Sequence, residues 1–311
     1  MISIFKSIQD KGLKEIEDIQ AGCWINMVAP SDEEIALIAK KTGAPIEYLK
    51  AALDEEESSR LEVEDDNILI IVDIPFTEME YNSLTYDTYP LAIIHTKNEI
   101  VTVCLKDSKI LKGFTEGKVT SFHTFKRSRF ILQILYRIAN FYLIYLRQID
   151  KKSVLVEKQL HKSMKNRELI QLLALEKSLV YFSTSLKANE MTLEKMLKLY
   201  IIQKYVEDKD VLEDVIVENK QAIEMCNIYS NILSGTMDAY ASVISNNLNI
   251  VMKFLAAITI VMSIPNMVSG LFGMNVRIPF QNSPYGFWFV IAIVAGVSAT
   301  VTWVLSKKGM F

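Results

Sequence analysis

The sequence contains few of the residues from which enzyme active sites and disulfide frameworks are usually built. Its three cysteines, Cys23, Cys104 and Cys226, lie far apart and form no CxxC pair, which predicts buried free thiols in a reducing compartment. The three histidines are isolated from one another, and the chain has no HExxH motif, Gly-rich phosphate loop or nucleophile elbow. We therefore expect no enzyme, no organic cofactor and no ATP-driven step.

The sequence also has no excess of positive charge, and its first residues lack the pattern typical of an N-terminal leader. The chain has 37 acidic residues against 34 Lys and Arg, so its net charge of −3 leaves no basic field for nucleic acid. Residues 1–12 carry a polar residue at every second or third position. We therefore expect no signal peptide.

Proline is absent between Pro90 and Pro265, and glycine is sparse over most of that stretch. Leu, Lys, Glu, Ile and Met recur there at helical spacing, which predicts long helices with breaks near Asn166 and at residues 208–210. We expect the last helix to run from about residue 211 into the apolar end of the chain.

Two uncharged apolar runs form this end of the chain, residues 254–271 and 287–305. Each holds about 18 or 19 residues, and a helix needs about 17 to 25 to cross the hydrocarbon core. This pattern predicts a two-span hairpin in preference to two buried helices of a large soluble protein. Lys253, Lys307 and Lys308 flank the spans, whereas Arg277 lies between them. The positive-inside rule then places both ends of a multi-pass membrane protein in the cytoplasm.

Residues 1–118 combine strand and helix signals. Ser31 and Glu34 form a capping-box pattern before a helix that Gly43 would end. Runs rich in β-branched residues predict strands at 23–28, 68–74, 90–95 and 99–105. The predicted fold class is thus an α+β cytoplasmic domain (1–118), joined to long α-helices that form a cytoplasmic stalk (119–252) and to a transmembrane helical hairpin (253–311) with an outer loop at 272–286.

Small and polar residues follow one face of the first span at alternating steps of three and four. They are Asn249, Met252, Ala256, Thr259, Ser263, Asn266 and Gly270. Their period near 3.5 is that of helices packed around a shared axis. Two interpretations fit, close packing between helices or several copies around a water-filled pore. Asn266 favours the pore because it follows Pro265, and a carbonyl freed by proline is tolerated at membrane depth where it lines a cavity.

The turn between the spans carries Gly273-Met274-Asn275, at one membrane face, where it can meet ions from bulk water. Neither span holds a carboxylate. Because Mg²⁺ dehydrates reluctantly, neutral amide and carbonyl oxygens suit an ion that passes with its water shell. We therefore hypothesise passage of hydrated divalent cations, which a flux measurement on Asn275→Ala would test.

At these residues the chain resembles the CorA-type divalent cation channels. The resemblance rests on the Gly-Met-Asn motif between two C-terminal spans, on SGTMDAY at 234–240 and on SNNLNIVMK at 245–253. It implies a funnel-shaped homopentamer whose long helix lines the pore, with a ring of Asn275 that captures hydrated Mg²⁺. Asn266, Ser263, Leu255, Met252 and Asn249 match pore-facing positions. Leu255 and Met252 would form an apolar constriction that gates by dewetting, although the polar stripe itself centres on Ala256.

The resemblance also implies regulatory metal sites. Asp214 matches a position where Mg²⁺ bridges neighbouring subunits, and Asp238 matches an acidic position nearer the membrane. Bound ions would hold the channel closed, and falling cytoplasmic Mg²⁺ would release it. The partner of Asp214 is not evident, because Ala51 stands at the matching position, near the acidic run 54–57. The outer loop also carries Arg277 and no acidic residue, unlike that of many relatives.

The predicted function is a passive, Mg²⁺-gated channel for Mg²⁺, with Co²⁺ and Ni²⁺ as further ions, in the inner or plasma membrane. Its expected partners are its own copies, the lipid bilayer and divalent cations. Two alternatives stay open, a Zn²⁺ transporter of the same superfamily and a non-conducting, membrane-anchored helical sensor. The intact Gly-Met-Asn motif favours Mg²⁺ over Zn²⁺, and Asn266, Ser263 and Asn275 argue against the sensor.

Overall fold

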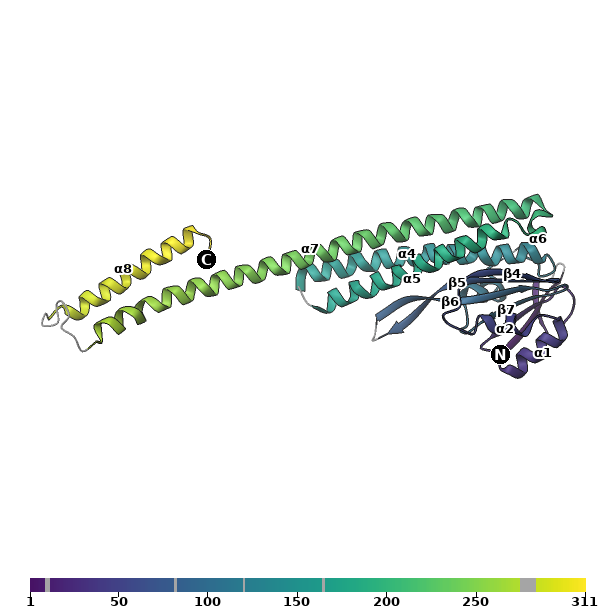
Figure 1. Cartoon of the computed structure of the whole chain (residues 1–311), viewed down its shortest axis with the longest axis horizontal. Coiled ribbons are helices and arrows are strands. Elements are labelled where there is room, and N and C mark those ends of the chain that lie inside the picture. The colour runs from purple at the N-terminus through teal and green to yellow at the C-terminus, as the bar shows by residue number, and fades with distance from the viewer. Residues whose placement is uncertain (9–11, 81–82, 120, 164–165, 275–283) are drawn as a thin grey trace. The chain divides into compact units, whose positions relative to one another are not determined.

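The computed structural model describes residues 1–8, 12–80, 83–119, 121–163, 166–274 and 284–311. The chain divides into two compact units, residues 1–235 and 236–311 (Figure 1). One helix, α7, contributes residues to both. The boundaries at 118 and 252 drawn from the sequence stay predictions.

A seven-stranded sheet forms the centre of unit 1, in the order β2-β1-β3-β7-β6-β5-β4. All neighbouring strands are antiparallel except β3 and β7, which are parallel. The strands are β1 (Ile2–Ile8), β2 (Gly12–Ile16), β3 (Trp24–Val28), β4 (Arg60–Glu64), β5 (Asn67–Glu80), β6 (Ser83–His95) and β7 (Ile100–Cys104).

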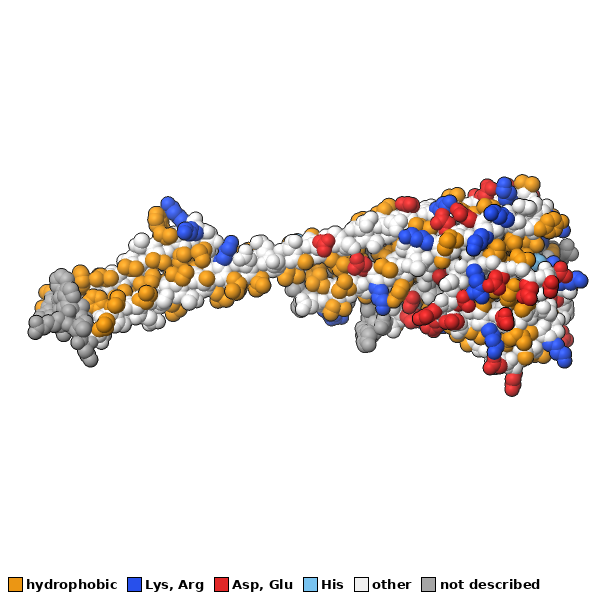
Figure 2. Space-filling view, viewed as in Figure 1, with side chains coloured by type: hydrophobic (Ala, Val, Ile, Leu, Met, Phe, Trp, Pro, Cys, Tyr) orange, Lys and Arg blue, Asp and Glu red, His pale blue; other side chains and the backbone are white. Residues whose placement is uncertain are grey.

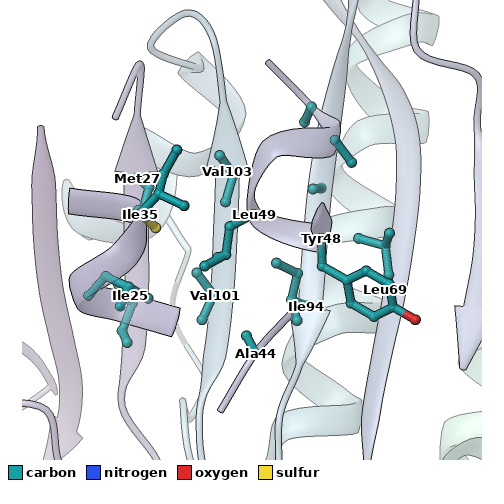
Figure 3. Close-up of a cluster of buried hydrophobic side chains, with 14 of the residues drawn as sticks. Ile25, Met27, Ile35, Ala44, Tyr48, Leu49, Leu69, Ile94, Val101 and Val103 are labelled. Atoms are coloured by element: carbon teal, nitrogen blue, oxygen red, sulfur yellow. The ribbon is translucent and has the colours of Figure 1, made fainter. Parts of the chain in front are cut away.

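Helices cover both faces of this sheet. On one face, α1 (Asp32–Thr42) and α2 (Ile46–Ala51) bury Ile35 and Leu49 against Met27 and Val101 (Figure 3). On the other face, Trp24 meets the rings of Phe114 from α3 (Lys109–Thr115) and Phe130 from α4 (Arg127–Ser163). Because successive strand residues point to opposite faces, burial on both sides requires nearly continuous apolar strands, as β7 shows.

The local signals for α1 and for the inner strands are confirmed. The Ser31 hydroxyl accepts a hydrogen bond from the Glu34 N–H at 3.2 Å, and the Glu34 carboxylate accepts one from the Ser31 N–H at 2.9 Å. Gly43 ends the helix at φ 74°. The four predicted strands lie in β3, β5, β6 and β7. The prediction missed β1 and both edge strands, β2 and β4. Their exposed, charged residues weaken the apolar pattern because sheet edges are kept polar.

Long helices follow the sheet domain. They are α4, α5 (Asn166–Met196), the short α6 (Tyr200–Gln203) and α7 (Val206–Phe272). The predicted break near Asn166 coincides with the start of α5. The predicted break at residues 208–210 is wrong, because α7 begins at Val206 and places Glu207 and Asp208 in its first turn. Carboxylates are favourable at a helix N-terminus, so this acidic run starts the helix and does not interrupt it.

Unit 2 contains the end of α7 and the antiparallel helix α8 (Gly286–Lys307). Both predicted spans lie in helices that are long and apolar enough to cross a membrane. On the face drawn in Figure 2, charged side chains gather over unit 1, whereas the α7–α8 part carries mostly hydrophobic ones.

Candidate functional site

The end of α7 has two faces of different character. On one side, Ala257 is fully buried, and Val261, Ile264 and Val268 are half-buried. At 100° per residue, the predicted polar stripe lies on the opposite side of the helix. Within the single chain the stripe is exposed at Asn249, Met252, Ala256, Thr259, Asn266 and Gly270, and half-buried at Ser263.

The hydroxyl groups of the stripe donate to their own helix. Thr259 Oγ1 donates to the Leu255 carbonyl at 2.8 Å, and Ser263 Oγ lies 2.9 Å from the Thr259 carbonyl and 2.8 Å from that of Ile260. Their oxygens therefore remain available as acceptors, for example for water. Within the described part of the chain, no partner bonds to the carboxamides of Asn249 and Asn266. The stripe thus presents neutral acceptors and donors to whatever lies against it.

Pro265 lies inside α7, and the helix continues through it. Because proline has no N–H, the Val261 carbonyl lacks its usual donor four residues on. This backbone oxygen and the adjacent Asn266 side chain add polar atoms deep within the apolar segment.

The motif at 273–275 follows the last residue of α7. The Gly273 N–H donates to the Ser269 carbonyl at 2.9 Å, and a Cβ at Gly273 would lie 3.1 Å from that same oxygen. Glycine therefore allows the helix to close tightly at this point. Met274 is exposed. Asn275 and Arg277 lie outside the described residues.

The two acidic candidates are both exposed on α7, Asp214 in unit 1 and Asp238 in unit 2. Ala51, the last residue of α2, is buried in the core and has no ligand atom. In the run 54–57, Glu57 forms an ion pair with Arg60, whereas residues 54–56 are exposed. Nowhere in the described ranges do three His, Cys, Asp or Glu side chains gather into a group that could hold a metal ion.

The sequence analysis used Lys308 as a flanking charge but gave no role to residues 309–311, which end with Phe311 against α7. The ring of Phe311 meets that of Phe254 at 6.1 Å between centroids. A helix-stop signal was present, because Gly309 follows directly on Lys307 and Lys308. The contact with Phe254 has no sequence signal, since it joins residues 57 positions apart (311 − 254 = 57).

Comparisons with known proteins extend over almost the whole chain. The family described as "CorA-like Mg2+ transporter protein" matches residues 20–308. The cobalt/magnesium transport protein CorA of Methanocaldococcus jannaschii is 29% identical over 315 residues, which cover 97% of this chain and 96% of that protein. The protein of the same name from Thermotoga maritima is 21% identical, with 98% and 87% covered.

A solved structure shares the fold of the whole chain. The complete structure of the CorA magnesium transporter from Methanocaldococcus jannaschii superposes with a TM-score of 0.86 at 25% identity, covering 100% of this chain and 99% of the other. The predicted fold class is thereby confirmed for a single copy, with an α/β domain, long helices and two candidate membrane helices.

Proposed function

Because this chain belongs to the CorA-like Mg²⁺ transporter family, we propose that it is a passive channel for hydrated Mg²⁺ in the cell membrane. Co²⁺ is a further ion, since relatives over nearly the full length are named cobalt/magnesium transport proteins. In this proposal five copies form a funnel, both termini are cytoplasmic, and residues 119–252 form a stalk between the α/β domain and the membrane hairpin.

The two-faced end of α7 carries this proposal. The side with Ala257 and Val261 is buried or half-buried, whereas the face with Asn249, Thr259 and Asn266 is exposed in the single chain. Polar side chains at membrane depth are costly in contact with lipid and usually face a bundle interior or a water-filled cavity. Several copies arranged around an axis, each with this face inward, satisfy that requirement and create a polar path.

The ion is proposed to keep its water shell along this path. Asn275, with Gly273 and Met274, forms the outer entrance. Carboxamide, hydroxyl and carbonyl oxygens of the stripe then contact the hydration water and not the bare ion, because neither span offers a carboxylate. At the cytoplasmic end, Met252 and Leu255 are both exposed from α7. They would form the apolar constriction that closes by dewetting, and Ala256 would border it.

Regulation is proposed to act through Mg²⁺ at Asp214 and Asp238. Both carboxylates are exposed in one copy. Ligands from two copies can therefore share an ion. For Asp214, the exposed acids at residues 54–56 are the candidate partners in the neighbouring copy, because Ala51 offers no ligand atom and Glu57 is paired within its own copy. Ions that bind the closed state more tightly stabilise it.

Influx into liposomes tests the proposed function. Liposomes loaded with a Mg²⁺-sensitive dye, at low internal Mg²⁺ and inside-negative potential, are expected to show rapid influx with the unaltered protein. Asn275→Ala should abolish most of it, whereas Asn282→Ala, the same change elsewhere in the loop, should not. Folded oligomer without Mg²⁺ influx would contradict the proposal. Zn²⁺ flux would then distinguish a zinc transporter from a non-conducting sensor.

A further inference from the structure

The chain reverses direction directly after α8 in a complete helix-stop motif. The Gly309 N–H donates to the Ser306 carbonyl at 3.0 Å, and the Met310 N–H donates to the Leu305 carbonyl at 3.1 Å. Gly309 has φ 66°, in the left-handed region. Together these bonds form the Schellman arrangement, in which the residue after glycine bonds five positions back. Residues 308–311, here named the tail brace, are therefore held by the backbone in a defined path.

The tail brace ends on α7. The rings of Phe311 and Phe254 are perpendicular, at 90° and 6.1 Å between centroids, which is the favourable edge-to-face geometry. Leu305, which occupies the position of the apolar contact in a Schellman motif, is only 9% exposed. The brace is thus bonded to the end of α8 through its backbone and contacts α7 through the Phe311 ring.

The end of α8 is itself anchored. Lys307 Nζ lies 4.3 Å from the ring centroid of Trp303, a cation–π contact. Tryptophan and lysine at the end of a span are the residues that fix a helix at the membrane surface. Because the tail brace is attached to this anchored end of α8, its contact with Phe254 can restrict the movement of α7.

The contact on α7 lies at the height of the proposed constriction. Phe254 is two residues after Met252 and one before Leu255. Side chains two positions apart lie about 200° apart around a helix, so Phe254 lies on the side of α7 away from Met252. A force applied at Phe254 would therefore move the constriction residues without touching the pore.

We infer that the tail brace sets the position of α7 at the constriction and so helps to keep the pore closed. Phe311 is a positioning residue for the gate, acting through Phe254. This inference rests on the proposed channel function, but the mechanical contact it invokes can be measured without transport.

The structural test measures how firmly α7 is held. Nitroxide labels are placed on cysteines substituted at Ile250 and Val304, which are exposed, whereas the native cysteines are buried. Labelled full-length protein is diluted with unlabelled copies, and the distance distribution is recorded by pulsed dipolar spectroscopy. Phe311→Ala should widen the distribution. Phe287→Ala, a change of an exposed phenylalanine at the opposite end of α8, should leave it narrow. An unchanged distribution in Phe311→Ala would overturn the inference.

The functional test uses the internal Mg²⁺ concentration that half-closes the channel. Phe311→Ala and Phe254→Ala should each raise it by about threefold to tenfold, the range expected for the loss of one aromatic pair. Phe311→Tyr, which keeps the ring, should restore it. The double variant should resemble either single one, because both act through one contact. The gating role would be refuted if the double variant shifted this concentration by the product of the two single shifts. It would also be refuted if both single variants behaved as the unaltered protein. No influx in the unaltered protein would refute the proposed function instead, and the spectroscopic result would still stand.

Discussion

At the scale of single residues, Asn189 shows how one side chain joins α5 to the sheet. Its Nδ2 donates to the Asp73 carbonyl at 2.9 Å, and its Oδ1 accepts from the Asp73 N–H at 2.8 Å and from Ser59 Oγ at 2.9 Å. β4 begins at Arg60, opposite Ile71, so Asp73 lies beyond it. The Asn189 carboxamide therefore bonds to the backbone groups of Asp73 that β4 does not reach.

Replacing this side chain should strongly destabilise unit 1. Asn189→Leu leaves the part-buried Asp73 N–H without this acceptor and removes one donor from the Asp73 carbonyl, which keeps its bond from Tyr142 Oη at 3.1 Å. We expect the free energy of unfolding to fall by about 1 to 3 kcal/mol. Urea unfolding of the detergent-solubilised protein measures this change. Thr184→Leu is the control on the same helix, since Thr184 is exposed and its hydroxyl donates to the Val180 carbonyl one turn back. A loss no larger than that of the control would contradict the assignment.

His95 makes stability depend on pH. It is 9% exposed, and its burial, together with the charge of Arg127, lowers its pKa to about 4 from an ordinary value of 6.5. The unfolded chain therefore binds more protons than the folded one between these values, so folding loses stability as pH falls through 6.5 toward 4. The difference between the two pKa values corresponds to about 3 kcal/mol of folding stability, lost once the pH is below both values.

Unfolding measured at pH 7, 5.5 and 4.5 checks this effect. Relative to the unaltered protein, His95→Gln should lose less stability on acidification, because its side chain does not titrate. His161 is exposed, so His161→Gln should lose as much stability between pH 7 and pH 4.5 as the unaltered protein. Parallel curves for all three proteins would show that His95 does not cause the dependence.

At the scale of elements, the start of α7 depends on a contact with α4. Asp208 is buried in the first turn of α7, where its Oδ2 accepts from Ser128 Oγ at 2.6 Å and its Oδ1 lies 3.4 Å from Arg129. Ser128 and Arg129 belong to the first turn of α4. One carboxylate therefore lies near the positive ends of two helix dipoles.

Removing the Asp208 carboxylate should weaken the contact between the first turns of α4 and α7. Asp208→Ala is expected to lower the free energy of unfolding by about 2 kcal/mol, through loss of charge-assisted hydrogen bonds and of the dipole interaction. Asp210→Ala is the matched control, because Asp210 is exposed two positions further along the same helix. It should change stability by less than about 0.5 kcal/mol. Equal effects would mean that only local helix charge matters. Thermal or urea unfolding distinguishes these outcomes.

At the scale of the whole molecule, the proposed assembly predicts a response to Mg²⁺. Chelation should remove ions shared between copies, leaving the Asp214 carboxylates to repel neighbouring acids and loosening the oligomer. We expect trypsin to cleave the detergent-solubilised protein about tenfold faster in EDTA than in excess Mg²⁺. Asp214→Asn should remove most of that difference, whereas Asp66→Asn, an exposed acid on the turn between β4 and β5, should keep it. Equal cleavage rates with and without Mg²⁺ would contradict regulation by shared ions.

Local patterns in the sequence determined the two apolar helices, the long helices before them, the capping box at Ser31 and the polar stripe that includes Thr259 and Asn266. Each of these depends on residues within a few turns of one another, whose periodicity or capping chemistry is visible in order. The edge strands were missed because their exposed residues carry little apolar pattern, and the acidic run at 208–210 was misread as a break.

Tertiary structure alone decided which partners these elements meet. The bonds of Asn189 to Asp73, of Asp208 to Ser128 and the contact of Phe311 with Phe254 each join residues far apart in the chain. It also decided that Ala257 is buried, whereas most of the polar stripe is exposed in the single chain. Such choices depend on which surfaces the folded backbone brings together, and this pairing of distant residues leaves no periodic trace in the sequence.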